Sequence, residues 1–306
     1  MTVPSEFSFL RYLAAKKGVD DRALNRNVRE TLTGYLLERR GPSPCRVLEV
    51  GCGIGAMLER LLDWGVFGEA AYRGIDINPE VIGEARLRLP RYAAARGADL
   101  TIEAGRFMFQ KERQSVLVDF EAVDLFHFLA REPGRKWDLL LAHAFLDLVD
   151  LSATLPDLLA LLDSGGLCYF TLNFDGATIF EPTLDLELDR QIERLYHRTM
   201  DDRRINGRPS GDSLTGRRLL GRLQAMGVQV LAAGSSDWVV FAGKTGYSGD
   251  EAYFLHFIIH TIGQALQGHP EIDPARLEDW LKERHSQIIR GELIYIAHQL
   301  DVLGQV

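Results

Sequence analysis

The sequence has few cysteines and no long uninterrupted apolar run. Three cysteines among 306 residues follow neither a disulfide framework nor a metal-binding spacing. A reducing compartment is the simplest explanation, and we expect a cytoplasmic protein. The N-terminal residues include acidic side chains and lack the apolar core of a signal peptide. The longest apolar segment, near 137–151, is broken by His143, Asp147 and Asp150, so no membrane-spanning helix is predicted.

An excess of basic residues is also absent. Lysine and arginine number 35 against 43 acidic residues, which gives a formal net charge of −8. Proteins that depend on many phosphate contacts usually carry a basic face, so nucleic acid is not an expected partner. The hydrophobic content of 46% and charged content of 25% are typical of a globular protein. A chain of this length can bury a sizeable core without disulfides.

The pattern of apolar residues divides the chain into three sections. They are a helical N-terminal section at 1–41, a core at 42–245 and a helical C-terminal section at 246–306. The core alternates strands with helices, which predicts a mostly parallel sheet covered on both faces. Two strands at 228–231 and 237–242 are joined by five residues, a link short enough to favour an antiparallel pair.

Helices are predicted in both end sections. They run from Phe7 to Lys17, from about Asp20 to Arg40, and over 251–266, 274–289 and 292–303. Within the second helix, Leu24, Val28, Leu32 and Leu36 recur four residues apart and form one apolar stripe. Such a stripe must be buried, so we expect the end sections to pack on the core. A homodimer interface is the alternative use of the same faces.

The most informative segment is a strand that runs into three glycines and then a helix. Val47–Val50 precedes Gly51, Gly53 and Gly55, and a helical run begins at Met57. Glycines at such a turn adopt backbone conformations closed to other residues and let a ligand approach the main chain. The helix start offers unpaired N–H groups to an anionic group. The spacing also satisfies the dinucleotide fingerprint, so NAD remains a candidate ligand.

Acidic residues follow the next two strands. Asp76 ends the strand at 71–76, where a carboxylate can accept both hydroxyls of a ribose. Ribose is common to NAD and S-adenosylmethionine (SAM), so Asp76 alone does not choose between them. Asp124 follows the strand near 116–120, with Asp119 as a competitor for the same role. A fourth strand at 137–142 leads to His143, and a Gly165–Gly166 turn precedes a fifth strand.

Together these segments resemble the class I SAM-dependent methyltransferases. Residues 49–55 match the acidic-x-Gly-x-Gly-x-Gly of motif I, 75–79 match motif II, and 137–142 match motif IV. The resemblance covers residues 42–245 only. It implies a Rossmann-like α/β fold, a doubly wound, mostly parallel seven-stranded sheet with an antiparallel terminal strand, carrying helical extensions at both ends. An NAD-dependent oxidoreductase becomes the third choice.

The resemblance implies that SAM is the cofactor and that S-adenosylhomocysteine is the product formed from it. In the family the glycine turn and its acid surround the methionine part, the second acid holds the ribose, and the third acid with the next amide reads the adenine. The implied cofactor residues are Glu49, Gly51, Cys52, Gly53, Gly55, Asp76, Ile77, Asp124, Leu125, Ala142 and His143. Cys52 is interpreted as a small residue of the turn, since no base lies near it in sequence.

By family analogy, a small-molecule acceptor would lie beyond the fourth and fifth strands, under the helical extensions. His143 is a candidate general base, or a loop residue whose backbone contacts SAM. Tyr12, Asn173, His256 and His260 are candidates to contact the acceptor. The two histidines lie four residues apart, but no third ligand accompanies them, so no metal is expected. The alternatives are a protein or RNA methyltransferase, and a catalytically silent SAM-binding subunit.

Overall fold

The computed structural model describes residues 2–39, 41, 43–131, 134–205 and 207–306. Its strands are β1 (Cys45–Val50), β2 (Glu69–Asp76), β3 (Asp99–Glu103), β4 (Arg106–Lys111), β5 (Gln114–Ala122), β6 (Trp137–His143), β7 (Leu162–Glu181), β8 (Arg204–Ile205), β9 (Arg208–Pro209), β10 (Gln229–Ser235), β11 (Trp238–Val240) and β12 (Ile294–Gln305). Its helices are α1 (Phe9–Ala23), α2 (Arg26–Glu38), α3 (Ala56–Asp63), α4 (Pro79–Ala95), α5 (Leu125–Arg131), the 3₁₀ helix η1 (Leu146–Leu148), α6 (Leu151–Leu159), α7 (Leu186–Asp201), α8 (Thr215–Ala225), α9 (Glu251–Leu266) and α10 (Pro274–Arg290).

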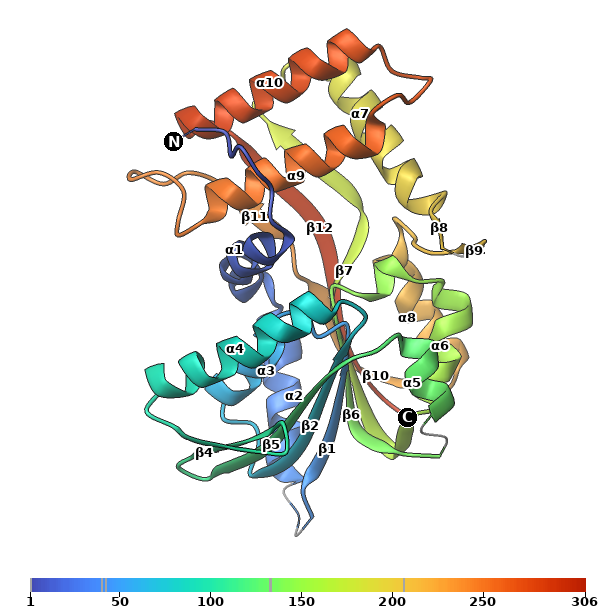
Figure 1. Ribbon diagram of the computed structural model, residues 1–306. Coiled ribbons are helices and arrows are strands. Elements are labelled where there is room, and N and C mark those ends of the chain that lie inside the picture. The colour runs from blue at the N-terminus through green and yellow to red at the C-terminus, as the bar shows by residue number, and fades with distance from the viewer. Residues whose placement is uncertain (1, 40, 42, 132–133, 206) are drawn as a thin grey trace.

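One large sheet organises the molecule (Figure 1). Its strand order is β10-β12-β7-β6-β1-β2-β5-β4-β3, with β11 paired to β12 beside β10. The pairs β5–β2, β2–β1, β1–β6 and β6–β7 are parallel. β12 is antiparallel to both β7 and β10. The predicted doubly wound, mostly parallel sheet with an antiparallel terminal strand is therefore confirmed. The predicted number of seven strands is wrong, because the sheet has ten strands in the described part of the chain, including the antiparallel β3 and β4 at one edge.

Alternating side chains of the central strands feed two separate cores. On β1, Val47 joins a cluster with α1, α2, α3 and α4, whereas Leu48 joins a cluster with α5, α6 and α8. Both side chains are fully buried. A strand with apolar residues on both sides requires cover on both faces of the sheet. Within the described residues, no helix is long and apolar enough to cross a membrane.

The C-terminal part of the sheet differs from the expected arrangement. The predicted helix over 292–303 is wrong, because residues 294–305 form β12 inside the sheet. The predicted hairpin between 228–231 and 237–242 is also wrong. β10 and β11 pair with successive stretches of β12, and a short link therefore joins two segments of one edge. The strand was missed because the polar residues His298, Gln299 and Asp301 lie next to one another or to apolar residues without a regular alternation, which hides a period of two.

The C-terminal helices are an insertion between strands of the sheet. Residues 241–293, with α9 and α10, lie between β11 and β12 in the chain, and we call them the helical lobe. β7 is 20 residues long and runs with β12 beyond the core sheet into this lobe. Figure 1 shows α9 and α10 above the core sheet, with α7 beside them. The final strand of the core therefore also carries the lobe.

The N-terminal helices meet the core at other positions than predicted. α1 continues through Gly18 to Ala23, and Asn25 caps α2 by accepting the Val28 N–H. The predicted helix start at Asp20 is wrong because this residue is buried within α1. The apolar stripe of the second helix is confirmed for Val28, Leu32 and Leu36, which are buried, whereas Leu24 is also buried but lies before the helix, at the C-cap of α1. Arg40 and Pro42, at the predicted boundary, lie outside the described residues.

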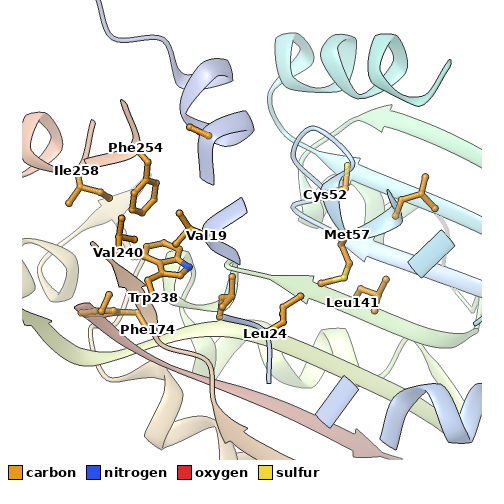
Figure 2. Close-up of a cluster of buried hydrophobic side chains, with 14 of the residues drawn as sticks. Val19, Leu24, Cys52, Met57, Leu141, Phe174, Trp238, Val240, Phe254 and Ile258 are labelled. Atoms are coloured by element: carbon orange, nitrogen blue, oxygen red, sulfur yellow. The ribbon is translucent and has the colours of Figure 1, made fainter. Parts of the chain in front are cut away.

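α1 lies between the core sheet and the helical lobe. Figure 2 shows Val19 of α1 beside Trp238, with Phe254 of α9 above them and Met57 of α3 on the other side. These side chains belong to one continuous apolar cluster. α1 therefore joins the two parts of the molecule, and its Asp20 contacts His143 at the carboxyl end of β6.

Candidate active site

The glycine turn between β1 and α3 has the backbone that the sequence pattern requires. Gly51, Gly53 and Gly55 have φ values of 64°, 55° and 79°, which disfavour other residues. Their surroundings differ. A Cβ at Gly51 would clash with the Phe145 ring, whereas a Cβ at Gly53 would meet open space. Gly51 thus leaves room for a protein side chain, and Gly53 presents an open backbone surface.

Asp76 at the end of β2 is connected directly to this turn. Its Oδ2 accepts the Gly53 N–H at 3.1 Å, and its Oδ1 accepts the Asn78 N–H at 2.9 Å. Burial raises the pKa of the carboxyl, while the two backbone donors lower it. The chain folds this way because Asn78 caps α4 and turns the backbone just after the strand. The acid and the glycine surface face one site.

Glu49 lies behind the turn instead of facing the open side. Its carboxyl group accepts the Tyr72 O–H at 2.5 Å, and the residue is only 1% exposed. Burial raises the pKa of Glu49 to about 8 despite this hydrogen bond. The adjacent Cys52 is also buried, and burial raises the pKa of its thiol well above the usual value. A neutral thiol agrees with the interpretation of Cys52 as a small turn residue.

Beyond Asp76, an apolar side chain and a helix start border the open side. Ile77 is 70% exposed, which is unusual for isoleucine and leaves an uncovered apolar surface. Asp124 precedes α5, and its Oδ1 accepts the N–H groups of Phe126 and His127. Leu125 is buried against the core. β2 and β5 are adjacent, and the Val123 N–H donates to the Asp76 carbonyl, which brings these positions together.

His143, at the end of β6, has both ring nitrogens engaged. Nδ1 lies 2.7 Å from Thr171 Oγ1, while Nε2 lies 3.0 Å from Arg60 Nη1 and 3.2 Å from Asp20 Oδ2. Burial and the Arg60 charge lower the pKa of His143 to about 4, outweighing the opposite effect of Asp20. The ring is therefore neutral at pH 7 and weakly basic. Ala142, just before it, is completely buried and pairs with Val50 of β1.

Asp20 of α1 is the centre of this polar cluster. Its carboxylate accepts the Lys16 ammonium at 2.6 Å and the Trp238 indole N–H at 2.9 Å, and it lies 3.6 Å from Arg60. Lys16, Asp20 and Arg60 are all buried, so each charge depends on its partners. These contacts hold the carboxyl of Asp20 ionised, with a pKa far below its usual value. The cluster attaches α1 to α3, β6 and β11.

The candidate acceptor residues do not form one group. Tyr12 stacks on Phe257 with ring centroids 4.2 Å apart, and His260 stacks on Phe7 at 4.0 Å. The Nδ1 of His256 lies 2.8 Å from Nδ1 of His285 on α10. These three candidates therefore lie in the layer of α1, α9 and α10. In the described residues, no set of three or more His, Cys, Asp or Glu side chains is arranged to hold a metal.

Asn173 lies apart from that layer, where β7 leaves the core sheet. Its Nδ2 donates to the Leu300 carbonyl at 2.8 Å, and its buried Oδ1 has no hydrogen-bond partner among the described residues. The preceding Leu172 has a φ of 53°, a strained value for a residue with a side chain. A strained backbone and an unsatisfied buried oxygen together mark this strand end as a functional candidate.

Sequence reasoning missed Lys16, Asp20, Arg60 and Trp238 as parts of the site. The four-residue spacing of Lys16 and Asp20 was a local signal for an ion pair on a helix, although it did not reveal burial. Nothing near Arg60 in sequence indicated that this charge points into the core. Contacts between α1, α3 and β11 join residues up to 218 positions apart, so only the fold brings them together.

Solved structures with a distant likeness cover almost the whole chain. A SAM-dependent methyltransferase from Thiobacillus denitrificans in complex with S-adenosyl-L-homocysteine is 17% identical, covers 98% of this chain and 99% of its own, and has a TM-score of 0.45. The cyclopropane synthase MmaA2 from Mycobacterium tuberculosis is 10% identical over 99% of this chain and 100% of its own, at 0.44. The strand order described above is observed in this chain itself and does not rest on either of these distant likenesses.

Comparison with curated proteins finds no match. A family model described as a methyltransferase domain matches residues 21–232. The matched span includes the glycine turn, Asp76, Asp124, His143 and Asn173. Because this span is well over half of the 306 residues, the chain belongs to the methyltransferase domain family, which confirms the resemblance to class I SAM-dependent methyltransferases.

Proposed function

We propose that this protein binds SAM at the carboxyl ends of β1, β2, β5 and β6 and transfers its methyl group to a small-molecule acceptor. The observation that carries the proposal is the direct hydrogen bond between Gly53 of the open turn and Asp76. This contact places an open backbone surface beside a carboxylate with acceptor capacity to spare. A nucleoside with an anionic tail fits such a pair of groups.

Each residue contributes binding or orientation. Asp76 would accept the ribose hydroxyls, and the uncovered side chain of Ile77 would pack against the adenine ring. The α5 start, with Asp124 and the Leu125 amide, would face the adenine edge. Glu49 would act from behind the turn, by fixing it against Tyr72. When bound, SAM supplies an electrophilic methyl group on a sulfonium.

We propose a positioning role for His143 instead of the expected general base. Its two nitrogens contact Thr171, Arg60 and Asp20, and its low pKa makes it a poor proton acceptor. An acceptor that is already nucleophilic at neutral pH needs no protein base, because alignment and exclusion of water supply most of the acceleration. This favours an unprotonated amine, a thiolate or a similar group.

A small acceptor is favoured by the position of α1. The helix is held over the site edge by the buried Asp20–Arg60 cluster and by Arg11–Asp250 and Arg22–Glu251 on its outer side. A folded protein or an RNA strand would need an open approach to this edge. A small molecule needs only a transient opening of α1.

Calorimetric titration with SAM, S-adenosylhomocysteine and NAD tests the cofactor. We expect binding of the first two and none of NAD. Incubation with methyl-labelled SAM and three separate pools, of small metabolites, proteins and RNA, tests the acceptor class. Label entering only the metabolite pool supports the proposal. Label in protein or RNA contradicts the acceptor class, and SAM binding without transfer to any pool favours a silent SAM-binding subunit.

A further inference from the structure

The sheet extension beyond the core has one face that no other part of the described chain covers. β11, β12 and the end of β7 lie side by side there, with Val239 opposite Ile296 and Ile296 opposite Ile179. Residues directly opposite in an antiparallel sheet point to the same face. Ile294 and Phe241 continue the alternation along β12 and just beyond β11. We call these five residues the outer face.

The outer face is apolar where a solvated sheet face should be polar. Phe241 is 57% exposed, Val239 44%, Ile179 43% and Ile294 38%. Antiparallel strands with one solvated face normally alternate apolar and polar residues. Here the intervening residues, including Trp238, Val240, Tyr295 and Phe180, are already buried on the inner face under α9. The strands are therefore apolar on both sides, as in a sheet covered on both sides.

The outer face approaches the apolar area that one subunit brings to a standard dimer interface. Its exposed fractions amount to about two complete large side chains, on the order of 300–400 Å². A standard interface buries about 800 Å² per partner, of which somewhat more than half is apolar. The outer face would thus supply most of the apolar part, with the surrounding polar residues as the rim.

We propose that the outer face is the interface of a homodimer, in which two copies stack these sheet faces about a two-fold axis parallel to β12. An apolar face is complementary to itself, as an isologous interface requires. Rotation about this axis places the β11 edge of one copy over the β7 edge of the other. Lys244 lies just beyond Phe241 on the first edge and Glu181 on the second, both exposed, so opposite charges meet at the rim.

The first test measures mass by light scattering and sedimentation over a range of micromolar concentrations. We expect wild type at twice 34.4 kDa. Phe241→Glu and Ile296→Glu should each weaken the dimer by about 30-fold or more, because a charge would be buried at the centre of the interface. Leu87→Glu on α4 is the matched control, since Leu87 is also 57% exposed but isolated from this face. Thermal melts establish that each variant is folded.

The second test is crosslinking near the proposed axis. Ile296→Cys should form an intermolecular disulfide on mild oxidation, whereas Leu87→Cys and wild type should not, since Cys52 and Cys168 are buried and Cys45 is partly covered. A wild-type monomer at every concentration overturns the proposal. So does a dimer that survives both charged variants, or a Leu87→Cys crosslink as efficient as that of Ile296→Cys.

Discussion

Two glycines of one turn have different tasks, although the sequence pattern treats them alike. Gly51 is required because the Phe145 ring occupies the space where a side chain would begin. Gly53 has no such neighbour, and its N–H instead holds Asp76. Substitutions at these positions should therefore separate an effect on folding from an effect on ligand binding.

Replacing each glycine by alanine tests this difference. Both changes strain a left-handed backbone by about 1 kcal/mol. Gly51→Ala adds a clash with a partly buried ring and should lower the free energy of unfolding by at least about 1 kcal/mol more than Gly53→Ala. Gly53→Ala should lower SAM affinity more. Urea unfolding measures the free energy of unfolding, and calorimetry measures the affinity for SAM. If Gly51→Ala lowered both quantities more than Gly53→Ala, the turn would be only structural.

Asp76→Ala should weaken SAM binding by about 1.5–3 kcal/mol, through loss of a charged acceptor. Calorimetric Kd values for SAM, at a temperature where the variant is folded, measure the effect. Asp99→Ala, on the exposed edge strand β3, is the control and should bind normally. Wild-type affinity in Asp76→Ala would remove the ribose assignment.

At the scale of the element, α1 is held in place by buried charges whose partners are brought together only in the folded protein. Asp20→Asn keeps the shape of the side chain but leaves Lys16 and Arg60 without their buried counter-charge, which typically costs about 3–5 kcal/mol. Asp21→Asn is the matched control. It also contacts Arg60, but its side chain is 40% exposed and the loss should stay below about 1 kcal/mol.

Hydrogen exchange gives the structural readout of the same pair. Amides of α1 should exchange faster in Asp20→Asn, while those of α4 should be unchanged apart from global unfolding. Equal effects of the two variants would show that Asp20 does not anchor the helix.

The elements that the sequence predicted well are those with strong local signals. β1 is followed by Gly51, β2 ends in Asp76 and β6 is a short apolar run that ends in His143, and the order of these segments was sufficient for the parallel sheet. β12 lacked such a signal, because its partners β7 and β10 are far away in the chain and the polar residues His298, Gln299 and Asp301 interrupt its apolar run. The predicted first helix ended before Gly18. In the structure α1 continues through this glycine, because packing against β11 and α9 stabilises the helix.

The candidate site was predictable where short local motifs build it. The turn at 51–55 and Asp76 are local features, and the structure brings them into contact. The acceptor candidates were chosen by residue type and helical spacing, which do not report distance. His256 and His260 consequently lie against α10 and Phe7. Asp20 and Arg60 became visible only through contacts between separate helices.

For the whole molecule, buried Glu49 predicts an unusual loss of stability towards alkaline pH. Its pKa is raised to about 8 in the folded state, against 4.5 for an ordinary carboxyl. The folded protein thus keeps a proton that the unfolded chain releases. The stabilisation is complete below about pH 4.5 and is lost as pH rises through about 8.

Between pH 6 and 8 this amounts to about 2 kcal/mol. Histidines such as His256, whose pKa is lowered to about 4, make the free energy of unfolding rise with pH instead, but mainly below pH 6.5. Urea unfolding of wild type and Glu49→Gln at pH 6 and pH 8 measures the difference. The variant should lose less free energy over this interval, and parallel slopes would contradict a neutral Glu49.

The place of β12 in the chain sets the order in which the molecule can be built. A ribosome finishes residues 1–293, including the whole helical lobe, before it makes the strand that lies between β7 and β10. Until then, β7 and β10 each expose an unpaired edge, and the lobe has no strand beneath it. Nascent chains are therefore open to edge-to-edge association until synthesis has passed β12. Chaperone demand should be greatest in the interval before β12 has been made.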